Sequence, residues 1–461
     1  MSIAGAFIVP HPPIILPEVG KGKEKEIQKT IDAYKETARQ IAKLKPDTIV
    51  LTSPHAVMYS DYFHISPGQS ARGDLGKFGV NNVKVEAVYD SEFVNALTEA
   101  AEKEKLPAGT LGEREKALDH ATIVPLRFIN EQYTSYKLVR IGLSGLSALD
   151  HYRLGKCIAG TAEKLARRVV FVASGDLSHK LKEDGPYGFD AAGPAFDKDI
   201  TAAMAKSDFL RFLTFDEDFC ESAAECGLRS FIIMAGALDG KAVDAEFLSY
   251  EGTFGVGYGV CAFIINGDDE NRHFDEIYKK KQTEQINAVK SGEDAYVRLA
   301  RLSLETFVKT GVKIKIPTGL PEEMLNQRAG TFVSLKKHGQ LRGCIGTISP
   351  VTDSVADEII RNAVSAGTED PRFPEVVESE LKDIVYSVDV LTPAEPIASI
   401  AELDVKRYGV IVSKGYKRGL LLPNLDGVNT PEQQVSIAIQ KGGIKPDENY
   451  TLERFEVVRH K

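Results

Sequence analysis

The sequence predicts an α/β N-terminal domain, with a mostly parallel sheet flanked by helices, followed by a C-terminal α+β domain. Two patterns predict this division. From Ser2 to about Asn266 apolar strands, polar loops and helices alternate, whereas hairpin signals dominate beyond residue 293. The chain has 461 residues, 43% hydrophobic and 27% charged, which is ordinary usage for globular proteins. A chain of this length can form two domains that each bury a core.

The strands expected in the first domain are short apolar runs, and helical segments lie between them. The expected strands are Ile3–Val9, Thr48–Leu51, Val83–Val88, Lys137–Leu143, Val169–Ala173 and Val256–Ile265. The expected helices are Lys23–Leu44, Ser91–Glu104, Gly155–Leu165 and Ala192–Ala205. Strands separated by helices usually pair in parallel, because the helix carries the chain back across the sheet. We therefore assign residues 1–267 to a first domain with a largely parallel sheet.

Residues 268–292 are expected to form a charged linker. This segment is rich in Asp, Glu, Lys and Asn, and its run Lys279-Lys280-Lys281 has no apolar face of its own. Such a run is typical of a solvated connector rather than of a binding patch.

The second domain, residues 293–461, begins with an expected helix from about Glu293 to Thr310. Hairpins follow, and each consists of two apolar runs around a turn that contains glycine. The expected strand pairs are Phe332–Lys336 with Leu341–Ile348, and Val410–Ser413 with Leu420–Leu422. Helices combined with hairpins predict an α+β domain.

Composition and charge exclude several classes of function. The formal net charge of −9 provides no basic field for general binding of nucleic acid or membrane surfaces. No uncharged run reaches the roughly 20 residues that a membrane helix needs. The segment Met1–Pro10 lacks the basic flank of a signal peptide, so we expect a cytoplasmic protein, which could form a homo-oligomer.

The cysteines are scattered and form no CxxC pair. They are Cys157, Cys220, Cys226, Cys261 and Cys344. An odd number at irregular spacing favours reduced thiols over disulfides or a zinc knuckle. The cysteines alone therefore predict no metal site.

Three histidines directly follow predicted strands. His11 follows Ile3–Val9, His55 follows Thr48–Leu51, and His179 follows Val169–Ala173 after a short polar loop. Open α/β sheets bind ligands at the carboxyl ends of their strands, so these positions favour a site. Prolines 12 and 54 restrict the backbone beside His11 and His55.

Two imidazoles and a carboxylate leave open coordination positions on a metal, as in non-haem iron(II) oxygenases. The alternative for each histidine is a helix cap or a core position with a hydrogen-bond partner; taken together, the three favour a metal site. The remaining histidines lack a strand-end context, and we expect surface roles for them. They are His64, His151, His273, His338 and His460.

Four motifs of the first domain resemble the LigB-type class III extradiol dioxygenases and their Memo-like relatives, over roughly Ser2 to Asn266. The motifs are Pro10-His11-Pro12-Pro13, Ser53-Pro54-His55, Leu118-Asp119-His120 and Ser174-Gly175-Asp176-Leu177-Ser178-His179. The resemblance implies that His11, His55 and a late glutamate hold iron(II) and that His179 is the acid/base. It also implies that His120 stabilises bound dioxygen or orients a catechol-like substrate.

The late glutamate has more than one candidate. Glu225 best matches the family position, and Glu251 is a weaker candidate. Cys226 is a rival ligand, because Memo-like relatives have a cysteine in this neighbourhood. Asp119 and Asp176 are expected either to orient the imidazoles or to cap loops. Iron(II) is the expected metal, although zinc, manganese and copper accept the same donors.

The second domain contains one candidate of its own. Cys344 stands between two glycines in Leu341–Thr347, where another backbone or a ligand can approach closely. Its thiol is either a nucleophile or redox group, with only His338 placed to activate it, or a packed, inert side chain.

The Cys344 motif, together with Glu369–Pro374 and Arg418–Pro423, resembles the AMMECR-type domain over roughly Glu293 to Lys461. Fusion with a LigB-like domain resembles the A component of the AmmeMemoRadiSam system, which implies a radical SAM protein as partner. Two functions are therefore expected as alternatives. One is an iron(II)-dependent dioxygenase that opens a catechol-like ring. The other is a metal-binding or redox component that helps a radical SAM partner modify a macromolecule or small molecule, without ring cleavage.

A third hypothesis is weaker. The second domain would bind RNA or another macromolecule through scattered basic residues such as Lys414, Lys417 and Arg418. These residues form no continuous basic stripe, which is the usual electrostatic signature of nucleic-acid binding.

Overall fold

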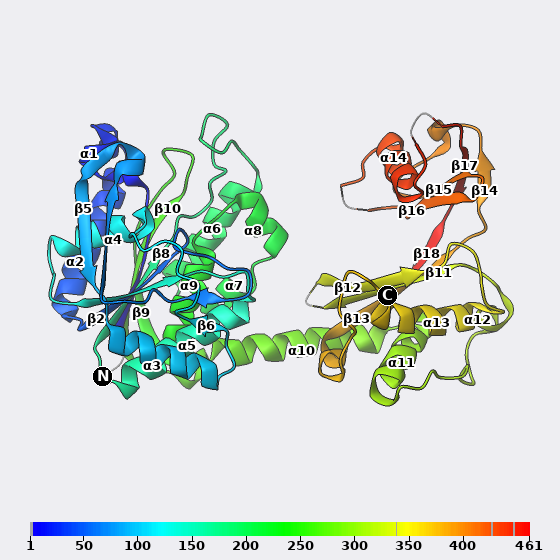
Figure 1. Cartoon of the computed structure of the whole chain (residues 1–461), viewed down its shortest axis with the longest axis horizontal. Coiled ribbons are helices and arrows are strands. Elements are labelled where there is room, and N and C mark those ends of the chain that lie inside the picture. Colours follow the sequence, from blue (N-terminus) through cyan, green and yellow to red (C-terminus); the bar gives the residue numbers. More distant parts are fainter. Residues whose placement is uncertain (1–2, 338, 426, 446–447) are drawn as a thin grey trace. The chain divides into compact units, whose positions relative to one another are not determined.

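The structure is a computed structural model that describes residues 3–337, 339–425, 427–445 and 448–461. The chain forms two compact units (Figure 1). The first unit ends at Lys279 and the second begins at Lys280.

A six-stranded sheet forms the centre of the first unit. Its order is β7 (Lys137–Gly142), β2 (Thr48–Ser53), β8 (Val169–Ser174), β1 (Ile3–Val9), β10 (Tyr258–Asp268) and β9 (Lys241–Glu251). The first four strands are parallel, whereas β10 is antiparallel to β1 and β9 to β10. The connection from β9 to β10 is too short for a crossover, so these two strands form a hairpin. The mostly parallel sheet is thus confirmed.

The central strands are apolar on both faces because helices cover both. β2 and β8 are buried along their whole length. One core lies between the sheet and the helices α3 (Ser91–Lys103), α5 (Ala148–Lys164) and α9 (Leu228–Ala237). The other lies between the sheet and α2 (Gln28–Leu44) and α4 (His120–Asn130).

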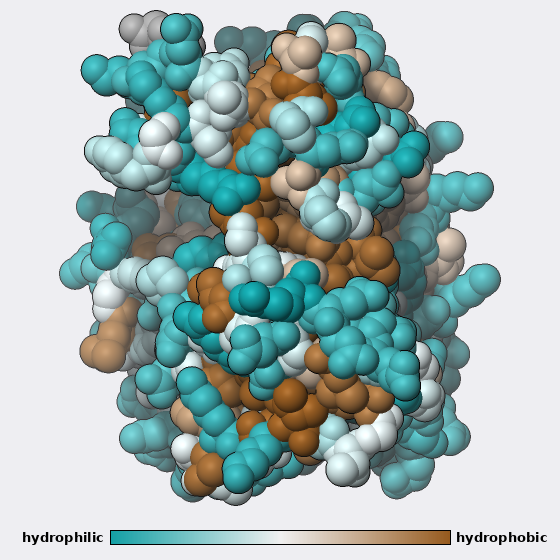
Figure 2. Space-filling view, turned by 90° about the vertical axis from the view of Figure 1, so that its right-hand side faces the viewer, coloured by the Kyte–Doolittle hydropathy of each residue, from teal (hydrophilic) through white to brown (hydrophobic). Residues whose placement is uncertain are grey.

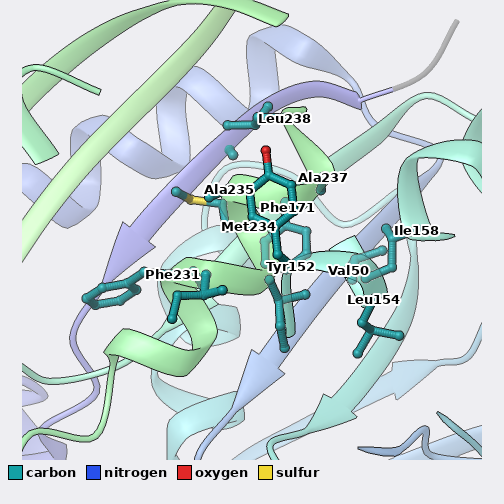
Figure 3. Close-up of a cluster of buried hydrophobic side chains, with 14 of the residues drawn as sticks. Val50, Tyr152, Leu154, Ile158, Phe171, Phe231, Met234, Ala235, Ala237 and Leu238 are labelled. Carbon is teal, nitrogen blue, oxygen red and sulfur yellow. The ribbon is translucent and has the colours of Figure 1, made fainter. Parts of the chain in front are cut away.

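Helices α5 and α9 approach each other at their backbones. A Cβ on Gly155 would lie 2.0 Å from the Ile233 carbonyl oxygen, and one on Gly236 would lie 1.9 Å from that of Tyr152. Figure 3 shows side chains of both helices packed with Val50 of β2 and Phe171 of β8. This contact holds the C-terminal half of α9 against α5.

Several boundaries differ from the sequence expectation. The run predicted as strand Val83–Val88 is β5 (Val80–Val88), but it pairs with β4 in a separate two-stranded sheet. Helix α5 begins before the predicted Gly155, because the Ser147 hydroxyl caps it by accepting a hydrogen bond from Asp150 N. The remaining elements of this unit are η1 (Pro13–Ile15), α1 (Pro17–Gly20), η2 (Lys23–Ile27), β3 (Phe63–His64), β4 (Ser70–Leu75), η3 (Gly76–Phe78), β6 (Ala108–Gly109), α6 (Ala192–Ala205), α7 (Phe209–Leu213), α8 (Glu217–Ala223) and η4 (Glu270–Arg272).

Most of the expected charged linker is helical. Helix α10 (Phe274–Gly292) contains the boundary between the two units. Lys279 pairs with Asp275 one turn earlier, at 3.2 Å, and such pairs stabilise a helix. The lysine run therefore lies on a helix rather than on an open connector.

The second unit contains two antiparallel sheets and several helices, which confirms the α+β prediction. One sheet has the order β12-β11-β13-β18 and packs against α11 (Ala295–Thr310) and α13 (Val355–Thr368). The other has the order β14-β17-β15-β16 and packs against α14 (Pro431–Lys441). The remaining bounds are α12 (Glu322–Asn326), β11 (Thr331–Lys337), β12 (Gln340–Gly346), η5 (Glu378–Asp383), β13 (Ile384–Leu391), β14 (Glu395–Ile397), η6 (Ile400–Glu402), β15 (Gly409–Lys414), β16 (Lys417–Leu421), β17 (Thr451–Phe455) and β18 (Val457–His460).

The surface mixes polar and apolar side chains. Figure 2 shows apolar surface toward the middle of one face, with hydrophilic side chains around it. Among the described residues, no helix is both long enough and apolar enough to cross a membrane.

Candidate metal centre

Histidines predicted from the sequence gather at one edge of the first unit's sheet. His11 follows β1, His55 follows β2, and His120 is the first residue of α4. Strands β2, β8 and β1 are adjacent and parallel, so their carboxyl ends meet at this edge. The ring centroids lie 5.0 Å apart for His11 and His55, 4.2 Å for His55 and His120, and 5.5 Å for His11 and His120.

Two overlapping groups of side chains could hold a metal ion. One consists of His11, His55 and His120, and the other of His11, Asp176 and Cys226. Within each group the ligand atoms lie within 4.8 Å of one another. Because His11 belongs to both groups, it is the centre of the candidate site.

The hydrogen bonds of His11 leave one ring nitrogen free for a metal. The Ser174 hydroxyl lies 2.7 Å from the Ala121 carbonyl oxygen, to which it donates its only proton. Its oxygen therefore accepts from His11 Nδ1, 3.1 Å away, so that Nδ1 carries the ring proton. The lone pair is then on Nε2, and a fixed tautomer of this kind is typical of histidine ligands.

Asp176 and Cys226 lie beside this nitrogen. The Asp176 carboxylate accepts a hydrogen bond from His11 N at 2.8 Å, and its other oxygen is 3.8 Å from His11 Nε2. The Cys226 sulfur is also 3.8 Å from Nε2. A Cβ on Gly175 would lie 2.2 Å from the Gly227 Cα, so only two glycines permit the approach of the two loops.

Glu225, the predicted third ligand, belongs to neither group. Its carboxylate accepts a hydrogen bond from Leu228 N at 2.6 Å, at the start of α9. Burial raises its pKa to about 7. Glu225 as a ligand therefore stays a prediction. Its rival Cys226, and also Asp176, which was expected only to orient an imidazole or to cap a loop, lie closer to His11. The weaker candidate Glu251 bonds to the backbone and hydroxyl of Thr30 in α2.

Asp119 organises the loops that carry two of the histidines. Its carboxylate caps α4 by accepting a hydrogen bond from Thr122 N at 3.0 Å. It also accepts from the Ser53 hydroxyl at 2.6 Å, and the Ser53 oxygen accepts from His55 N at 3.2 Å. The capping alternative therefore describes the observed contacts of Asp119, and these contacts fix the backbone next to His55 and His120.

His179 has a buried ring nitrogen without a partner. Its Nε2 has no hydrogen-bond partner in the described part of the chain. Its ring stacks on Tyr187, with the centroids 4.9 Å apart. Burial lowers its pKa, against an opposing effect of Asp176, so the ring is neutral at pH 7. A neutral imidazole with a free ring nitrogen is suited to proton transfer.

The electrostatics of the site favour a cation. Burial lowers the pKa of His11 well below its usual value and that of His120 to about 3, so both rings are neutral. Burial also raises the pKa of Asp176 to about 6, although the hydrogen bond from His11 N opposes this shift. Neutral imidazoles beside a carboxylate and a thiol suit a transition-metal ion.

The match to known families follows the two units. Residues 5–261 match the family described as "Catalytic LigB subunit of aromatic ring-opening dioxygenase". The chain belongs to the LigB family. Residues 297–460 match the AMMECR1 family. Both resemblances expected from the motifs are thereby confirmed.

Relatives of this LigB-family chain include one that matches it along its whole length. A protein of Clostridium acetobutylicum is 45% identical, with 100% of both chains covered. A protein of Thermotoga maritima is 50% identical over 37% of this chain and 99% of its own.

Two solved structures resemble parts of the chain. An uncharacterized protein from Pyrococcus horikoshii is 33% identical, with a TM-score of 0.34, over 36% of this chain and 88% of its own. An uncharacterized protein from Escherichia coli K12 is 15% identical, with a TM-score of 0.38, over 56% of this chain and 99% of its own.

The surface positions that the sequence predicted for two histidines of the LigB unit are wrong. The rings of His64 and His151 are fully buried, each with one nitrogen bonded to a backbone carbonyl. His273 and His460 pair with Asp239 and Asp294 near the surface. His338 lies outside the described residues.

Cys344 in the AMMECR1 unit is surrounded by paired groups. Its backbone N–H donates to Asp370 at 2.9 Å, and Arg372 pairs with the same carboxylate at 2.7 Å. The Ser334 hydroxyl donates to its sulfur at 3.2 Å. Burial raises the pKa of the Cys344 thiol, so it is protonated at pH 7. The adjacent Gly343 allows helix α13 to approach, since a Cβ there would lie 2.1 Å from the Ala366 carbonyl oxygen.

The basic residues proposed for RNA binding have other contacts. Lys414 pairs with Glu448 at 3.0 Å, and Arg418 pairs with Glu453 at 3.3 Å. Lys417 donates to the Gly443 carbonyl oxygen at 2.6 Å. Because these cations are already engaged, they add no support to the RNA hypothesis.

Proposed function

We propose that the LigB unit is a non-haem iron(II)-dependent extradiol dioxygenase that opens the ring of a catechol-like substrate. The convergence of His11, His55 and His120 beside the unpartnered Nε2 of His179 carries this proposal. Family membership supports dioxygenase-type chemistry. We place the reaction in the cytoplasm, where the free cysteines would stay reduced.

The metal would be held by His11, His55 and one carboxylate. Asp176 is the carboxylate closest to His11 Nε2 and is our candidate, because Glu225 would first have to release Leu228 N. When bound, iron(II) would supply open positions at which a diol and dioxygen meet. Both atoms of one dioxygen molecule would enter the product as the carbon–carbon bond beside the diol breaks, so no external reductant is consumed.

The histidines around the metal would handle protons and orientation. His179, neutral at pH 7, would take a hydroxyl proton of the substrate on Nε2 and later return it. Such acid–base assistance contributes roughly 10² to 10⁴ in rate. His120 lies between His55 and Phe78, at ring distances of 4.2 and 5.1 Å, where it would help to orient the bound ring.

Oxygen consumption tests this proposal. The protein would be reconstituted with iron(II) without oxygen and then assayed for oxygen uptake with a panel of catechols. We expect uptake with at least one catechol, and a loss of about 100-fold or more in His179→Ala without loss of iron. His273→Ala is the matched control, because that histidine lies outside the site. Iron binding without uptake for any catechol would contradict ring cleavage.

Cys226 favours a second candidate function. Its sulfur lies 3.8 Å from His11 Nε2, as close as the Asp176 carboxylate, and thiolates prefer softer metals such as copper(I) or zinc. The chain would then be a metal-binding or redox component that assists a radical SAM partner without ring cleavage. Tight metal binding that depends on Cys226, together with no oxygen uptake, would favour this candidate.

A further inference from the structure

Two loops of the LigB unit form an open hollow at the surface, and the histidines of the candidate metal centre do not line it. Its volume is about 320 Å³, and its walls are Tyr59, Tyr62, Leu111, Gly112 and Arg114. We call this set of residues the aromatic cup. Ligand pockets begin at roughly 300 Å³, and a cavity of about 150 Å³ already accepts benzene. The cup is therefore large enough for one substituted ring.

The aromatic walls are fixed by two glycines. The rings of Tyr59 and Tyr62 lie edge to face, with centroids 6.3 Å apart. A Cβ on Gly112 would lie 2.4 Å from the Tyr59 hydroxyl, and one on Gly109 would lie 2.6 Å from the Tyr62 hydroxyl. Both glycines also have positive φ angles, which other residues rarely adopt. The tyrosines thus occupy space that side chains on this loop would otherwise fill.

Two hydrogen bonds fix the backbone of Leu111 and Gly112 at the rim of the cup. His64 donates from Nδ1 to the Leu111 carbonyl oxygen at 2.9 Å, and the Tyr59 hydroxyl donates to the Gly112 carbonyl oxygen. The Leu111 side chain itself is 75% exposed. A fixed backbone with an exposed apolar side chain is suited to contact with a ligand, because the backbone loses little conformational entropy on binding.

One cation lies over the cup without an anionic partner. The Arg114 guanidinium carbon is 5.2 Å from the centroid of the Tyr59 ring. Within the described ranges, Arg114 makes no hydrogen bond or ion pair. Its neighbouring carboxylates face other groups, because Glu113 pairs with Lys116 at 3.9 Å and Glu115 accepts from Ala117 N at 3.2 Å. The cup therefore offers a charge to a ligand.

We propose that the aromatic cup binds a small planar aromatic carboxylate. The ring of the ligand would pack against Tyr59 and Tyr62, since edge-to-face and offset stacking stabilise aromatic pairs. Its carboxylate would receive two parallel hydrogen bonds from Arg114, whose planar guanidinium matches that geometry. Charge complementarity selects this ligand over a neutral ring.

The cup stands at the same edge of the sheet as the histidines. Tyr59 comes four residues after His55 and forms a bridge with Ser144, just beyond the end of β7. Strands β7 and β2 are neighbours, so the cup adjoins the crevice where open α/β sheets bind ligands. The proposal requires no metal and is independent of the ring-opening proposal.

A second cavity of the LigB unit lacks the aromatic walls of the cup. Its volume is about 440 Å³, and of the four basic side chains in its lining, three face carboxylates of the same unit and Lys103 is the fourth. Lys156 and Lys279 both contact Asp275, at 3.3 and 3.2 Å, and Arg153 contacts Asp150 at 3.1 Å. An anion would have to compete with these pairs.

Calorimetric titration of the metal-free full chain with benzoate tests the proposal. We expect saturable binding with a Kd of about 1 mM, because a ligand of this size has few contacts. Benzamide, which has the same shape without the charge, should bind at least about tenfold more weakly. Arg114→Gln should weaken benzoate binding by about tenfold or more. Tyr62→Leu should weaken it by a smaller factor through loss of the aromatic face.

Two further variants locate the bound benzoate. Lys116→Gln removes the same charge from an exposed side chain nearby, and it should leave the Kd within about twofold. His11→Ala should also retain binding, because the cup does not include the histidines. The proposal is overturned if benzoate shows no saturable binding in the millimolar range. It is equally overturned if Arg114→Gln binds as the native chain does, or if His11→Ala is the variant that loses binding.

Discussion

Cys226 in the LigB unit and Cys344 in the AMMECR1 unit each lie next to a glycine where backbones approach closely, but their surroundings differ. Near Cys226, the Nε2 atom of His11 has no strong hydrogen-bond donor, and the buried Nε2 of His179 in the same site has no hydrogen-bond partner among the described residues. Around Cys344, Asp370, Arg372 and Ser334 bond to the cysteine or to each other. The first arrangement leaves polar atoms for a ligand, whereas the second satisfies them within the protein.

The carboxylates of the two units show the same contrast. In the LigB unit burial raises the pKa of Asp197 to about 6 and that of Glu225 to about 7. In the AMMECR1 unit, hydrogen bonds from Arg372 lower the pKa of Asp370, and those from Arg342 lower the pKa of Glu380 to about 2. Asp197 and Glu225 accept hydrogen bonds from uncharged donors, whereas Asp370 and Glu380 pair with arginines.

Loss of metal binding is the largest effect expected from this contrast. His11→Ala should abolish binding of about one metal equivalent, because His11 belongs to both donor groups. Cys344→Ala should retain the metal, since the groups around that thiol are already paired. Metal analysis after anaerobic titration and dialysis measures both variants. Equal metal loss in the two would break the comparison between the units.

The next largest expected effect is the change in metal affinity when the third ligand is replaced. Asp176→Asn should weaken metal binding by about 100-fold, because the variant keeps the acceptor for His11 N but loses the negative charge. Glu225→Gln should change the affinity by less than about tenfold, since Glu225 faces Leu228 N. Competition with a chelator of known affinity measures both constants. If Glu225→Gln loses more metal affinity than Asp176→Asn, Glu225 is the third ligand, as the sequence predicted.

Asp197 gives the LigB unit a distinctive pH dependence. Its carboxylate is buried and accepts hydrogen bonds from Ser178 N and the Tyr250 hydroxyl. A folded-state pKa of about 6 exceeds the unfolded value, so the free energy of unfolding should fall as pH rises from about 4 to 6. The decrease should be of order 2 kcal/mol.

Hydrogen exchange in α6 and β8, corrected for the intrinsic rate, measures this dependence in the metal-free protein. Asp197→Asn should reduce the pH dependence, because asparagine does not titrate, and the raised pKa values of Asp176 and Glu225 should account for the remainder. An unchanged slope in that variant would assign the dependence to another group.

Glu380 should give the AMMECR1 unit the opposite dependence, and a smaller one. Its pKa is lowered by Arg342 and Lys337, so the stabilisation is present above the unfolded pKa and is lost as pH falls from about 4.5 toward 2. The loss should be about 1 kcal/mol, because solvent screens a partly exposed pair. Exchange in β12 at acid pH measures it. Glu380→Gln should show no such loss, whereas the exposed Glu378→Gln should behave like the native chain.

The sequence predicted the positions of the histidines because parallel strands bring their carboxyl ends together. His11 and His55 needed only the order of strand and loop to be placed at one edge. Helix α6 has the predicted bounds, Ala192–Ala205, and the predicted hairpins are β11–β12 and β15–β16. These features depend on local periodicity and turn residues.

Features that depend on distant contacts were not predictable. Glu225 and Cys226 are adjacent in sequence. The hydrogen bond from Leu228 N to Glu225, together with the contact of Gly227 with Gly175, decides which of them faces His11. The pairing of β5 with β4 outside the main sheet likewise depends on contacts between segments, which local sequence patterns do not reveal. The burial of His64 follows from its place on the short strand β3, which single-sequence periodicity does not reveal.

The close contact of Gly175 with Gly227 joins two loops that are distant in sequence, so the donors that these loops carry come together only when the domain has folded. The donors near His11 are separated in the chain by roughly fifty residues each, so every pair closes a long loop before it can share an ion. The metal cannot nucleate this fold as it does in a small zinc domain. Loading should be a late event that follows the docking of α9. A bound ion should then retard unfolding, because it binds the assembled chain and not the open one.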